Sequence, residues 1–276
     1  MSALTALVVE VEAVNPGTID GATGQAVQGF WLHHWRSLDP QLSQTMHDPA
    51  AVKPYTVSPL MGLSHPQRGC ISIARGQRAW FRVVSLDAQL SQRLAEEWLP
   101  LLPETIPIAG LEWKILRTAL DQQQHPWAGQ TDFSVLTALA HNGAGAQEWH
   151  LQLTTPTTFK FAKYNLPFPL PGLLVHSWRS RWNETGGEFI PDEVEEQAKT
   201  ELVVSAYALK TVPVRSPTRV LIGCVGELTL KAVGLDAAAC QAVDALCSFA
   251  FWAGSGQHTT QGLGMTRLVS DGVKSG

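Results

Sequence analysis

The chain has 276 residues, a hydrophobic content of 45% and a formal net charge of −4, which predict one large or two ordinary globular domains. Charged residues make up only 16% of the chain, and this composition excludes a largely disordered protein. The acidic balance excludes a uniformly basic nucleic-acid-binding surface, so a nucleic-acid partner would require basic residues gathered on one face.

The cysteines and the N-terminus exclude further classes. The four cysteines form no C-x-x-C pair and have no histidine at zinc-like spacing, so we expect buried thiols and no metal site. The N-terminal residues lack the basic segment of a signal peptide, and no apolar run approaches membrane-spanning length. We therefore expect a soluble, cytoplasmic protein with no membrane partner.

The first half of the chain predicts the element order β-α-β-β-α-β, which is the ferredoxin-like arrangement. Asp39-Pro40 and Asp48-Pro49 end two helices, and Asp87 is expected to cap a third. Residues 75–78 predict a hairpin turn between two strands. The expected elements are a strand at 6–13, helices at 22–38 and 41–47, an extended segment at 53–60, strands at 71–73 and 79–84, a helix at 87–99, and strands at 106–108 and 112–120.

The second half predicts the same order again after a linking region at 129–145, whose most flexible part is Asn142-Gly143-Ala144-Gly145. The fold class is therefore α+β, with two tandem ferredoxin-like (βαββαβ) domains at residues 1–140 and 146–276. The expected elements are a strand at 148–155, a helix within 166–182, strands at 202–207 and 218–230, a helix at 237–252 and a last strand at 265–269.

A glycine-rich loop, Gly254 to Met265, connects the last helix to the last strand. Glycines permit positive φ, and consecutive amides freed in this way can form an anion-binding concavity. The spacing is neither a dinucleotide-binding fingerprint nor a Walker A loop. A turn that binds nothing is the alternative interpretation.

Two motifs at opposite ends of the chain carry a resemblance to a known family. The first comprises Gln28-Gly29, Met46-His47 and the segment from Lys53 to Leu60, Lys-Pro-Tyr-Thr-Val-Ser-Pro-Leu. The second is the pattern G-x-G-x(5)-G-x-G-Met. Together they resemble the repeat-processing endoribonucleases of the RAMP superfamily of CRISPR systems. The resemblance implies metal-independent cleavage of precursor CRISPR RNA into guide RNAs, without a cofactor. It implies 2′-hydroxyl attack that leaves 2′,3′-cyclic phosphate and 5′-hydroxyl ends.

The resemblance also implies catalytic residues. His47 stands at the position of the family's catalytic histidine, and imidazole suits proton transfer near neutral pH. Lys53 could place an ammonium against the scissile phosphate. His33 or His34 could supply a second proton-transfer group, although Leu32 stands where relatives often have tyrosine. The alternatives are a surface histidine that ends a helix and a solvated loop lysine.

The residues assigned to RNA binding lie in the second half. The glycine-rich loop contributes Gly254, Gly256, Gln257, His258, Gly262 and Gly264. Arg179 and Arg181 are expected to hold the stem of the repeat, and Lys160 belongs to a stretch that interleaves cations with aromatics. An edge strand with snorkelling lysines is the alternative for that stretch. Lys163, Lys210, Arg215 and Arg219 complete the basic set, and the acidic stretch at 192–196 must face away from bound RNA.

Three hypotheses follow for the function. The first is an endoribonuclease that cuts CRISPR repeat RNA, with precursor and mature guide RNA as partners. The second is a non-catalytic RAMP subunit that binds guide RNA and scaffolds an interference complex. The third is an unrelated two-domain ferredoxin-like protein that binds a small metabolite. Association with other subunits of an interference complex and formation of a homodimer both stay open.

Overall fold

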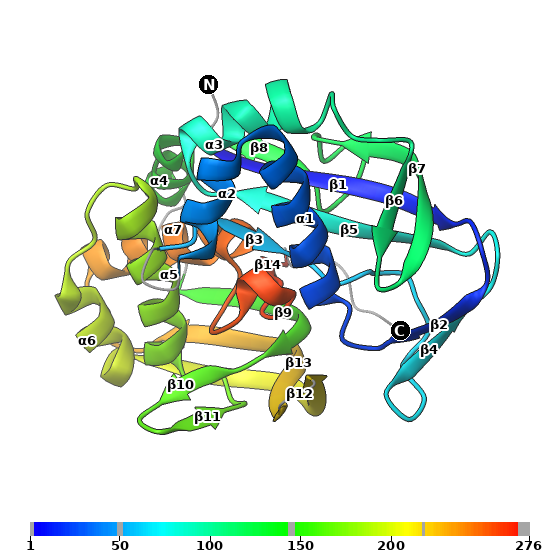
Figure 1. Cartoon of the computed structure of the whole chain (residues 1–276). Helices are drawn as coiled ribbons and strands as arrows, with labels where there is room; N and C mark the ends of the chain where they lie inside the picture. The colour runs from blue at the N-terminus through cyan, green and yellow to red at the C-terminus, as the bar shows by residue number, and fades with distance from the viewer. Residues whose placement is uncertain (1–2, 49–51, 143–146, 217–218, 270–276) are drawn as a thin grey trace. The chain divides into compact units, whose positions relative to one another are not determined.

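The computed structural model describes residues 3–48, 52–142, 147–216 and 219–269 (Figure 1). Contacts between Cα atoms divide the chain into two units. Unit 1 comprises residues 1–131, 215–219 and 260–262, and unit 2 comprises residues 132–214, 220–259 and 263–276. Within the described ranges, no helix is long and apolar enough to span a membrane.

Unit 1 contains a mixed set of helices and strands in ferredoxin-like order (Figure 1). Its main sheet has the strand order β3-β5-β1-β7-β6, with β8 paired to β1. In a βαββαβ unit the fourth strand lies beside the first and the third lies on its other side, and β7, β1, β5 and β3 occupy those places. The elements are β1 Leu4–Ala13, β2 Gly17–Asp20, α1 Gly24–Leu38, α2 Pro40–His47, β3 Tyr55–Val57, β4 Cys70–Ile73, β5 Arg78–Ser85, α3 Ala88–Arg93, a π-helical turn Leu94–Trp98, β6 Thr105–Ile108, β7 Leu111–Ala119 and β8 Gly129–Thr131.

The core of unit 1 lies between the main sheet and its helices. Alternate residues of β1, including Val9, are fully buried and share one hydrophobic cluster with Trp31 and Trp35 of α1. Trp98 joins them, with its ring centroid 5.0 Å from that of Trp31. Asp87 caps α3 by accepting a hydrogen bond of 2.8 Å from Leu90 N, as the sequence predicts.

The predicted hairpin around residues 75–78 is wrong. β4 pairs with β2, with Gly17 opposite Ile73, whereas β5 pairs with β1. The β1–β5 pairing passes into the β2–β4 pairing near the hydrogen bond of 3.0 Å that Ala13 N donates to Gln77 O. An apolar alternation identifies a strand but not its partner, and Gly17–Asp20 is too short and too close to turn residues to give a strand signal.

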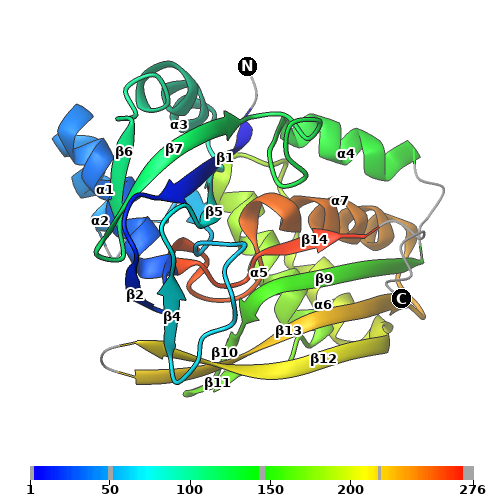
Figure 2. The same cartoon turned by 90° about the vertical axis from the view of Figure 1, so that its right-hand side faces the viewer.

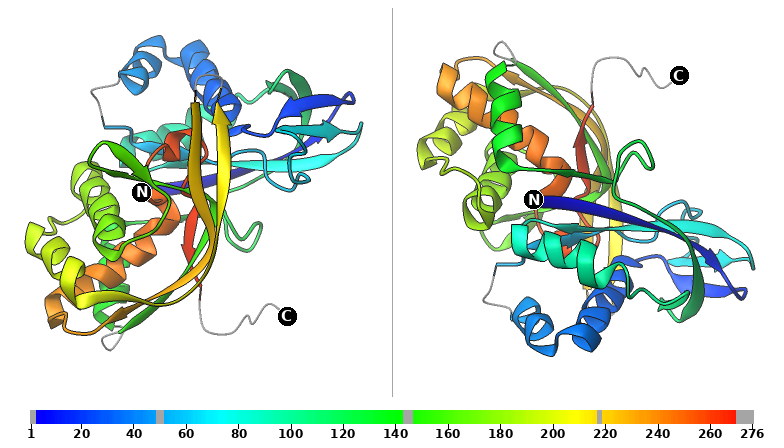
Figure 3. Two further views of the ribbon diagram at one scale, coloured as in Figure 1. Left: turned by 90° about the horizontal axis from the view of Figure 1, so that it is seen from below. Right: turned by 90° about the horizontal axis from the view of Figure 1, so that it is seen from above.

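Unit 2 has a sheet of order β12-β13-β9-β14, the same ferredoxin-like order (Figure 2). The predicted fold class of two ferredoxin-like domains is therefore confirmed. The helices of unit 2 lie on one side of the long β12 and β13 strands (Figure 3). The elements are α4 Phe133–Asn142, β9 Glu148–Thr157, β10 Phe159–Phe161, β11 Tyr164–Leu166, α5 Pro171–Thr185, α6 Asp192–Glu201, β12 Leu202–Ser216, β13 Arg219–Ala232, α7 Ala237–Ala253, a 3-10 turn Thr259–Gln261 and β14 Thr266–Leu268.

Two segments of the chain are more regular than the sequence predicts. Residues 129–142 of the predicted linking region form β8 and α4, and residues 143–145 lie outside the described part of the chain. α4 packs into unit 2 through Phe133, whose ring centroid is 5.0 Å from that of Trp182 and 5.6 Å from that of Phe249. The contact boundary thus follows Thr131, earlier than the boundary expected near residue 140. The acidic stretch at 192–196 begins helix α6, where carboxylates stabilise the N-terminal end.

Candidate active site and RNA-binding residues

α2 presents His47 at its last position. Asp39 caps the helix by accepting a hydrogen bond of 2.9 Å from Leu42 N, and Pro40 occupies the first turn, where no donor is lost. Ser43 Oγ donates to Leu32 O at 3.0 Å, and Met46 is buried in the core. His47 is exposed at the end of this fastened helix. An open hollow of about 560 Å³ is lined by Gln41, Gln44, Thr45, His47 and Asp48.

Lys53 lies next to the end of α2. Its Nζ donates to the carbonyl oxygen of Asp48, the residue after His47. A cation at the C-terminal end of a helix is favoured by the helix dipole. Partial burial lowers the pKa of Lys53, and the charge of Asp48 opposes this change. The structure therefore places the ammonium group of Lys53 against the backbone of the residue that follows His47.

His33 and His34 lie on different faces of α1. His34 is buried, and its Nε2 lies 3.2 Å from Trp98 O. Burial lowers the pKa of His34, which favours the neutral ring, while the backbone hydrogen bond acts in the opposite direction. His33 is exposed. Only His33 can therefore reach a bound substrate, and no described contact links it to His47.

The first backbone amides of the glycine-rich loop donate hydrogen bonds to other residues of unit 2. Four consecutive N–H groups, at residues 254–257, donate at 2.7–2.9 Å to Ala250 O, Gly264 O, Ser177 Oγ and Thr158 O. The amide of Gly264 donates to Pro156 O at 3.0 Å. These amides stabilise the loop itself and are not free to form the predicted anion-binding concavity. These acceptors could not be predicted from the sequence, because Thr158 and Ser177 are distant along the chain.

The glycines of this loop permit close backbone crossings. A Cβ atom on Gly256 (φ 75°) would lie 2.3 Å from Thr158 O, and one on Gly264 (φ 73°) would lie 2.1 Å from Ser255 O. Gly254 (φ 68°) faces Gly264 O in the same way, at 2.8 Å. Gly262 groups with unit 1, where a Cβ atom would lie 2.8 Å from Gly24 Cα. The loop is a rigid support for its side chains.

Gln257 and His258 are polar residues of the glycine-rich loop that remain accessible to solvent. Both are partly exposed, and His258 has φ of 58°, a left-handed conformation that costs a non-glycine residue free energy. Ser255 beneath them is fully buried and accepts a hydrogen bond of 2.9 Å from Trp178 Nε1. The loop therefore holds the backbone of His258 in a strained conformation, next to a segment that is fixed by the buried hydrogen bond of Ser255.

Lys160 lies on a small exposed hairpin formed by β10 and β11. Phe161 pairs with Tyr164 across the turn, and both side chains are more than half exposed, at 54% and 64%. Lys163 Nζ lies 5.4 Å from the centroid of the Tyr164 ring. The hairpin thus displays two cations and two aromatic rings at its tip, the composition noted in the sequence.

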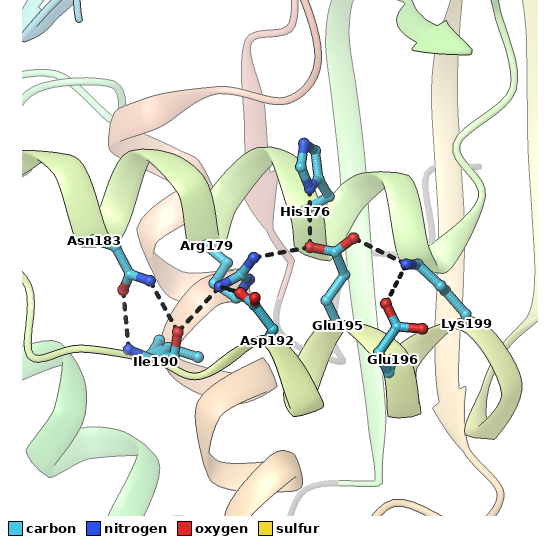
Figure 4. Close-up of polar contacts among 8 residues, drawn as sticks. All are labelled: His176, Arg179, Asn183, Ile190, Asp192, Glu195, Glu196 and Lys199. Carbon is cyan, nitrogen blue, oxygen red and sulfur yellow. Dashed lines mark hydrogen bonds and ion pairs between the residues drawn. The ribbon is translucent and has the colours of Figure 1, made fainter. Parts of the chain in front are cut away.

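Arg179 is held by acidic residues of α6 (Figure 4). Its guanidinium lies 2.5 Å from Asp192 Oδ1 and 3.1 Å from Glu195 Oε2, and it donates to Ile190 O at 3.3 Å. The side chain is only 12% exposed. Arg179 and the acidic stretch therefore lie together, so RNA cannot approach one without approaching the other.

Arg181 also has a structural partner. Its Nη1 donates to Ala253 O at 3.2 Å, at the end of α7. Arg215 and Arg219 have side chains outside the described part of the chain. Of the two arginines expected to hold the repeat stem, Arg179 is paired with carboxylates of α6 and Arg181 donates to a backbone carbonyl.

Two family models cover most of the chain. The model of the CRISPR Cas6 N-terminal domain matches residues 4–138, and the model of the CRISPR-associated endoribonuclease Cas6 matches residues 151–266. The chain belongs to the Cas6 family. The predicted resemblance to repeat-processing endoribonucleases is confirmed, and the match of both models in order agrees with the two ferredoxin-like units.

Solved Cas6 structures have the same fold. A product complex of Thermus thermophilus Cas6 (TTHB231) is 22% identical, with a TM-score of 0.81 over 96% of this chain and 100% of that chain. A product complex of another Cas6 (TTHA0078) is 25% identical, with a TM-score of 0.78 over 97% of this chain and 99% of that chain. A Cas6-related protein from Pyrococcus furiosus is 10% identical, with a TM-score of 0.62 over 98% of this chain and 100% of that chain. No curated protein sequence gives a significant match.

An acid-sensitive ion-pair network lies between α5 and α6 (Figure 4). Burial raises the pKa of Glu195, but hydrogen bonds from His176, Lys199 and Arg179 outweigh it and lower that pKa to about 2. A carboxyl group with a lowered folded pKa stabilises the protein above its unfolded pKa of about 4.3. This stabilisation is then lost as the pH falls from about 4.3 towards 2.

Replacement of Glu195 by glutamine is expected to lower the free energy of unfolding at pH 7 by about 2 kcal/mol. The deficit relative to wild type narrows as the pH falls below about 4, since protonation removes the same ion pairs from the wild type. Urea denaturation between pH 7 and pH 3 measures this. Glu196→Gln is the control, because Glu196 is 69% exposed and forms an exposed ion pair with Lys199. A deficit for Glu195→Gln that does not change with pH would contradict the assignment.

Proposed function

We propose that this Cas6 protein cleaves CRISPR repeat RNA in precursor transcripts to release guide RNAs, without a metal ion. The family supports CRISPR RNA processing by an endoribonuclease. The observation that carries the finer proposal is the pairing of an exposed His47, at the end of a fastened helix, with Lys53 on the adjacent carbonyl. Among the described residues, no group of three or more His, Cys, Asp or Glu could hold a metal ion.

The proposed reaction is attack by the 2′-hydroxyl on the neighbouring phosphate. His47 accepts the proton of that hydroxyl, the 2′-oxygen forms a bond to phosphorus, and the bond from phosphorus to the 5′-oxygen breaks. Lys53 stabilises the additional negative charge of the phosphorane. The products carry a 2′,3′-cyclic phosphate and a 5′-hydroxyl group.

The 5′-oxygen needs a proton as it leaves, and His33 is the proposed donor. His33 is exposed on α1, whereas His34 is enclosed by aromatic rings and faces Trp98 O. A solved Cas6 relative (TTHA0078) was also studied as a variant in which one histidine is replaced by alanine.

RNA binding is proposed for the side chains of Gln257, His258, Arg181 and Lys160. The loop that carries Gln257 and His258 is shaped by its glycines, Gly254, Gly256, Gly262 and Gly264. These glycines are given a structural role, because the amides at 254–257 already donate to protein acceptors. Arg179 is left out of the proposed set because Asp192 and Glu195 already neutralise it. Solved relatives include Cas6 complexes with product and with a substrate mimic, which supports binding of repeat RNA.

The second candidate is a guide-RNA-binding subunit that does not cut. The observation that favours it is the lack of a described contact between His47 and a second proton-transfer group. A structure described as a partial Cas6-RT-Cas1–Cas2 complex is similar over 98% of this chain and 46% of that chain, with 16% identity and a TM-score of 0.61. Association with other CRISPR subunits is therefore compatible with either candidate.

Cleavage in a chelator separates the two candidates. The purified protein is incubated with the repeat RNA of its own CRISPR array in excess EDTA. We expect one cut per repeat, at a rate equal to that without EDTA. Tight binding of the repeat with no cleavage in either buffer would favour the scaffold, and cleavage abolished by EDTA would contradict metal independence.

The β10–β11 hairpin gives a salt-dependent prediction. If Lys160 and Lys163 contact phosphates of single-stranded RNA, the double alanine variant lowers the slope of log affinity against log salt by about 1.4, or 0.7 for each phosphate. Filter binding between low and moderate salt measures the slope. Lys231→Ala is the control, because Lys231 is already paired with Glu148 at 2.7 Å. An unchanged slope in the hairpin variant would remove the hairpin from the RNA-binding set.

A further inference from the structure

Arg93 connects the start of α2 to the helix that follows β5. Its Nη1 donates to Asp39 Oδ2 at 2.8 Å, across 54 residues of sequence. Asp39 is also the residue whose other oxygen caps α2 at Leu42 N, and its own N–H donates to Trp35 O at 2.6 Å at the end of α1. One carboxylate therefore joins the corner between α1 and α2 to α3.

The guanidinium of Arg93 is itself fixed. Its Nε and Nη2 donate to the two oxygens of Glu97 at 2.8 and 2.7 Å, a bidentate pair. Its Cζ lies 5.2 Å from the centroid of the Trp35 ring, within cation–π distance. The side chain is 23% exposed. Three side chains, Asp39, Glu97 and Trp35, thus hold one cation in a single orientation, which a flexible surface ion pair lacks.

α2 is oriented by a few attachments: the pair of Asp39 with Arg93 at its start and, further along, the hydrogen bond from Ser43 to Leu32 O and the buried Met46 side chain. A helix of eight residues is too short to be stable alone, so its direction is set by its attachments. His47 lies eight residues after Asp39, or about 12 Å along the axis at 1.5 Å per residue. A tilt of about 10° at Asp39 would therefore displace His47 by about 2 Å. A misplacement of about 1 Å in a catalytic group can lower a rate by about 10²-fold.

We propose that Arg93 and Asp39 are positioning residues that set the direction of α2 and thereby the place of the His47 imidazole. The inference rests on the proposed catalytic role of His47. It goes beyond that role because neither Arg93 nor Asp39 touches RNA or the reacting atoms in the proposed reaction.

The test separates the ion pair from the helix cap. Asp39→Asn keeps a good capping side chain but removes the charge that Arg93 binds, since asparagine and aspartate cap helices about equally well. Arg93→Gln removes the cation, and Arg93→Lys keeps the charge but loses the bidentate geometry. Arg117→Gln is the matched control. It breaks another ion pair of unit 1, with Glu10 on β1, that has no connection to α2.

Three quantities are measured for each variant: the single-turnover cleavage rate constant with protein in excess, the Kd for the repeat RNA, and the thermal midpoint. We expect Asp39→Asn and Arg93→Gln to lower the rate constant at least about tenfold, with Kd within about twofold of wild type. Arg93→Lys is expected to recover part of the loss. The double variant should be no slower than the slower single variant, since both remove one interaction.

A wild-type rate constant for folded Asp39→Asn, with cleavage lost in His47→Ala, would overturn the positioning role and leave the proposed function intact. An equal loss in Arg117→Gln would also overturn it, because the effect would then be general to the sheet and its helices. Normal cleavage by His47→Ala would instead contradict the proposed function. A role limited to stability predicts a lower thermal midpoint with an unchanged rate constant, and this result too would overturn the inference.

Discussion

Replacement of His47 by alanine is expected to lower the single-turnover rate of repeat cleavage by about 10²- to 10⁴-fold, the usual contribution of a general base. The Kd for the repeat RNA should stay within about twofold of wild type, since a base acts in the transition state. The structural reason is that His47 is exposed at the end of α2, and its removal leaves the buried attachments of the helix, Ser43 and Met46, in place.

The control for this variant is His65→Ala, which removes another exposed histidine of unit 1. Its cleavage rate is expected to equal that of the wild type. Retention of a wild-type rate by His47→Ala would exclude His47 as the base. A large loss of RNA affinity in His47→Ala, with a normal rate for bound RNA, would reassign His47 to substrate binding.

Replacement of Gly264 by alanine is expected to lower the free energy of unfolding by about 3 kcal/mol or more. The added Cβ would lie 2.1 Å from the backbone oxygen of Ser255. Because this oxygen belongs to the backbone, it cannot move aside as the end of a flexible side chain could. A positive φ of 73° adds about 1 kcal/mol of strain for alanine. Urea denaturation of the whole chain measures the loss.

Gly76→Ala is the matched control for the strain alone. Gly76 has φ of 79°, and nothing lies within 4 Å of a Cβ placed there. We expect it to lose only about 1 kcal/mol. The difference between the two variants is therefore the cost of breaking the close crossing in the glycine-rich loop. Equal losses would show that the loop opens to accept a side chain and is not rigid.

The positions of the two proposed catalytic residues, His47 and Lys53, follow from local features of the sequence. His47 could be located from sequence, because Asp39-Pro40 and Asp48-Pro49 delimit its helix and the motif through Lys53 follows at fixed spacing. The contact of Lys53 with the carbonyl after His47 is local, so a short stretch of chain specifies it. Local chemistry of this kind is readable without a structure.

Contacts between distant residues explain what the sequence analysis missed. Arg179 is a plausible RNA ligand from its place on an amphipathic helix, but its carboxylate partners lie 13 and 16 residues away on α6, which was not predicted. The loop amides find acceptors at Thr158 and Ser177, about 80 to 100 residues earlier. Of two adjacent histidines on α1, only the packing of Trp98 decides that His34 is the buried one.

The fold itself followed from the order of elements, because two β-α-β-β-α-β runs have few compact solutions. The pairing of β4 with β2 did not follow, since the alternating pattern is the same for either partner. The hairpin β10–β11 was also ambiguous, because a stretch of alternating aromatics and lysines suits an edge strand and an RNA-binding tip equally.

A repeat RNA with a single 2′-deoxy substitution at the scissile nucleotide tests the central claim most directly. The claim is that the RNA's own 2′-hydroxyl is the nucleophile and that the protein supplies proton transfer and charge. We predict that the substituted RNA binds with the Kd of the unmodified repeat and is not cut, in EDTA or in Mg²⁺. Cleavage of the 2′-deoxy RNA at the same position would contradict the account, because the attacking oxygen would then have to come from water.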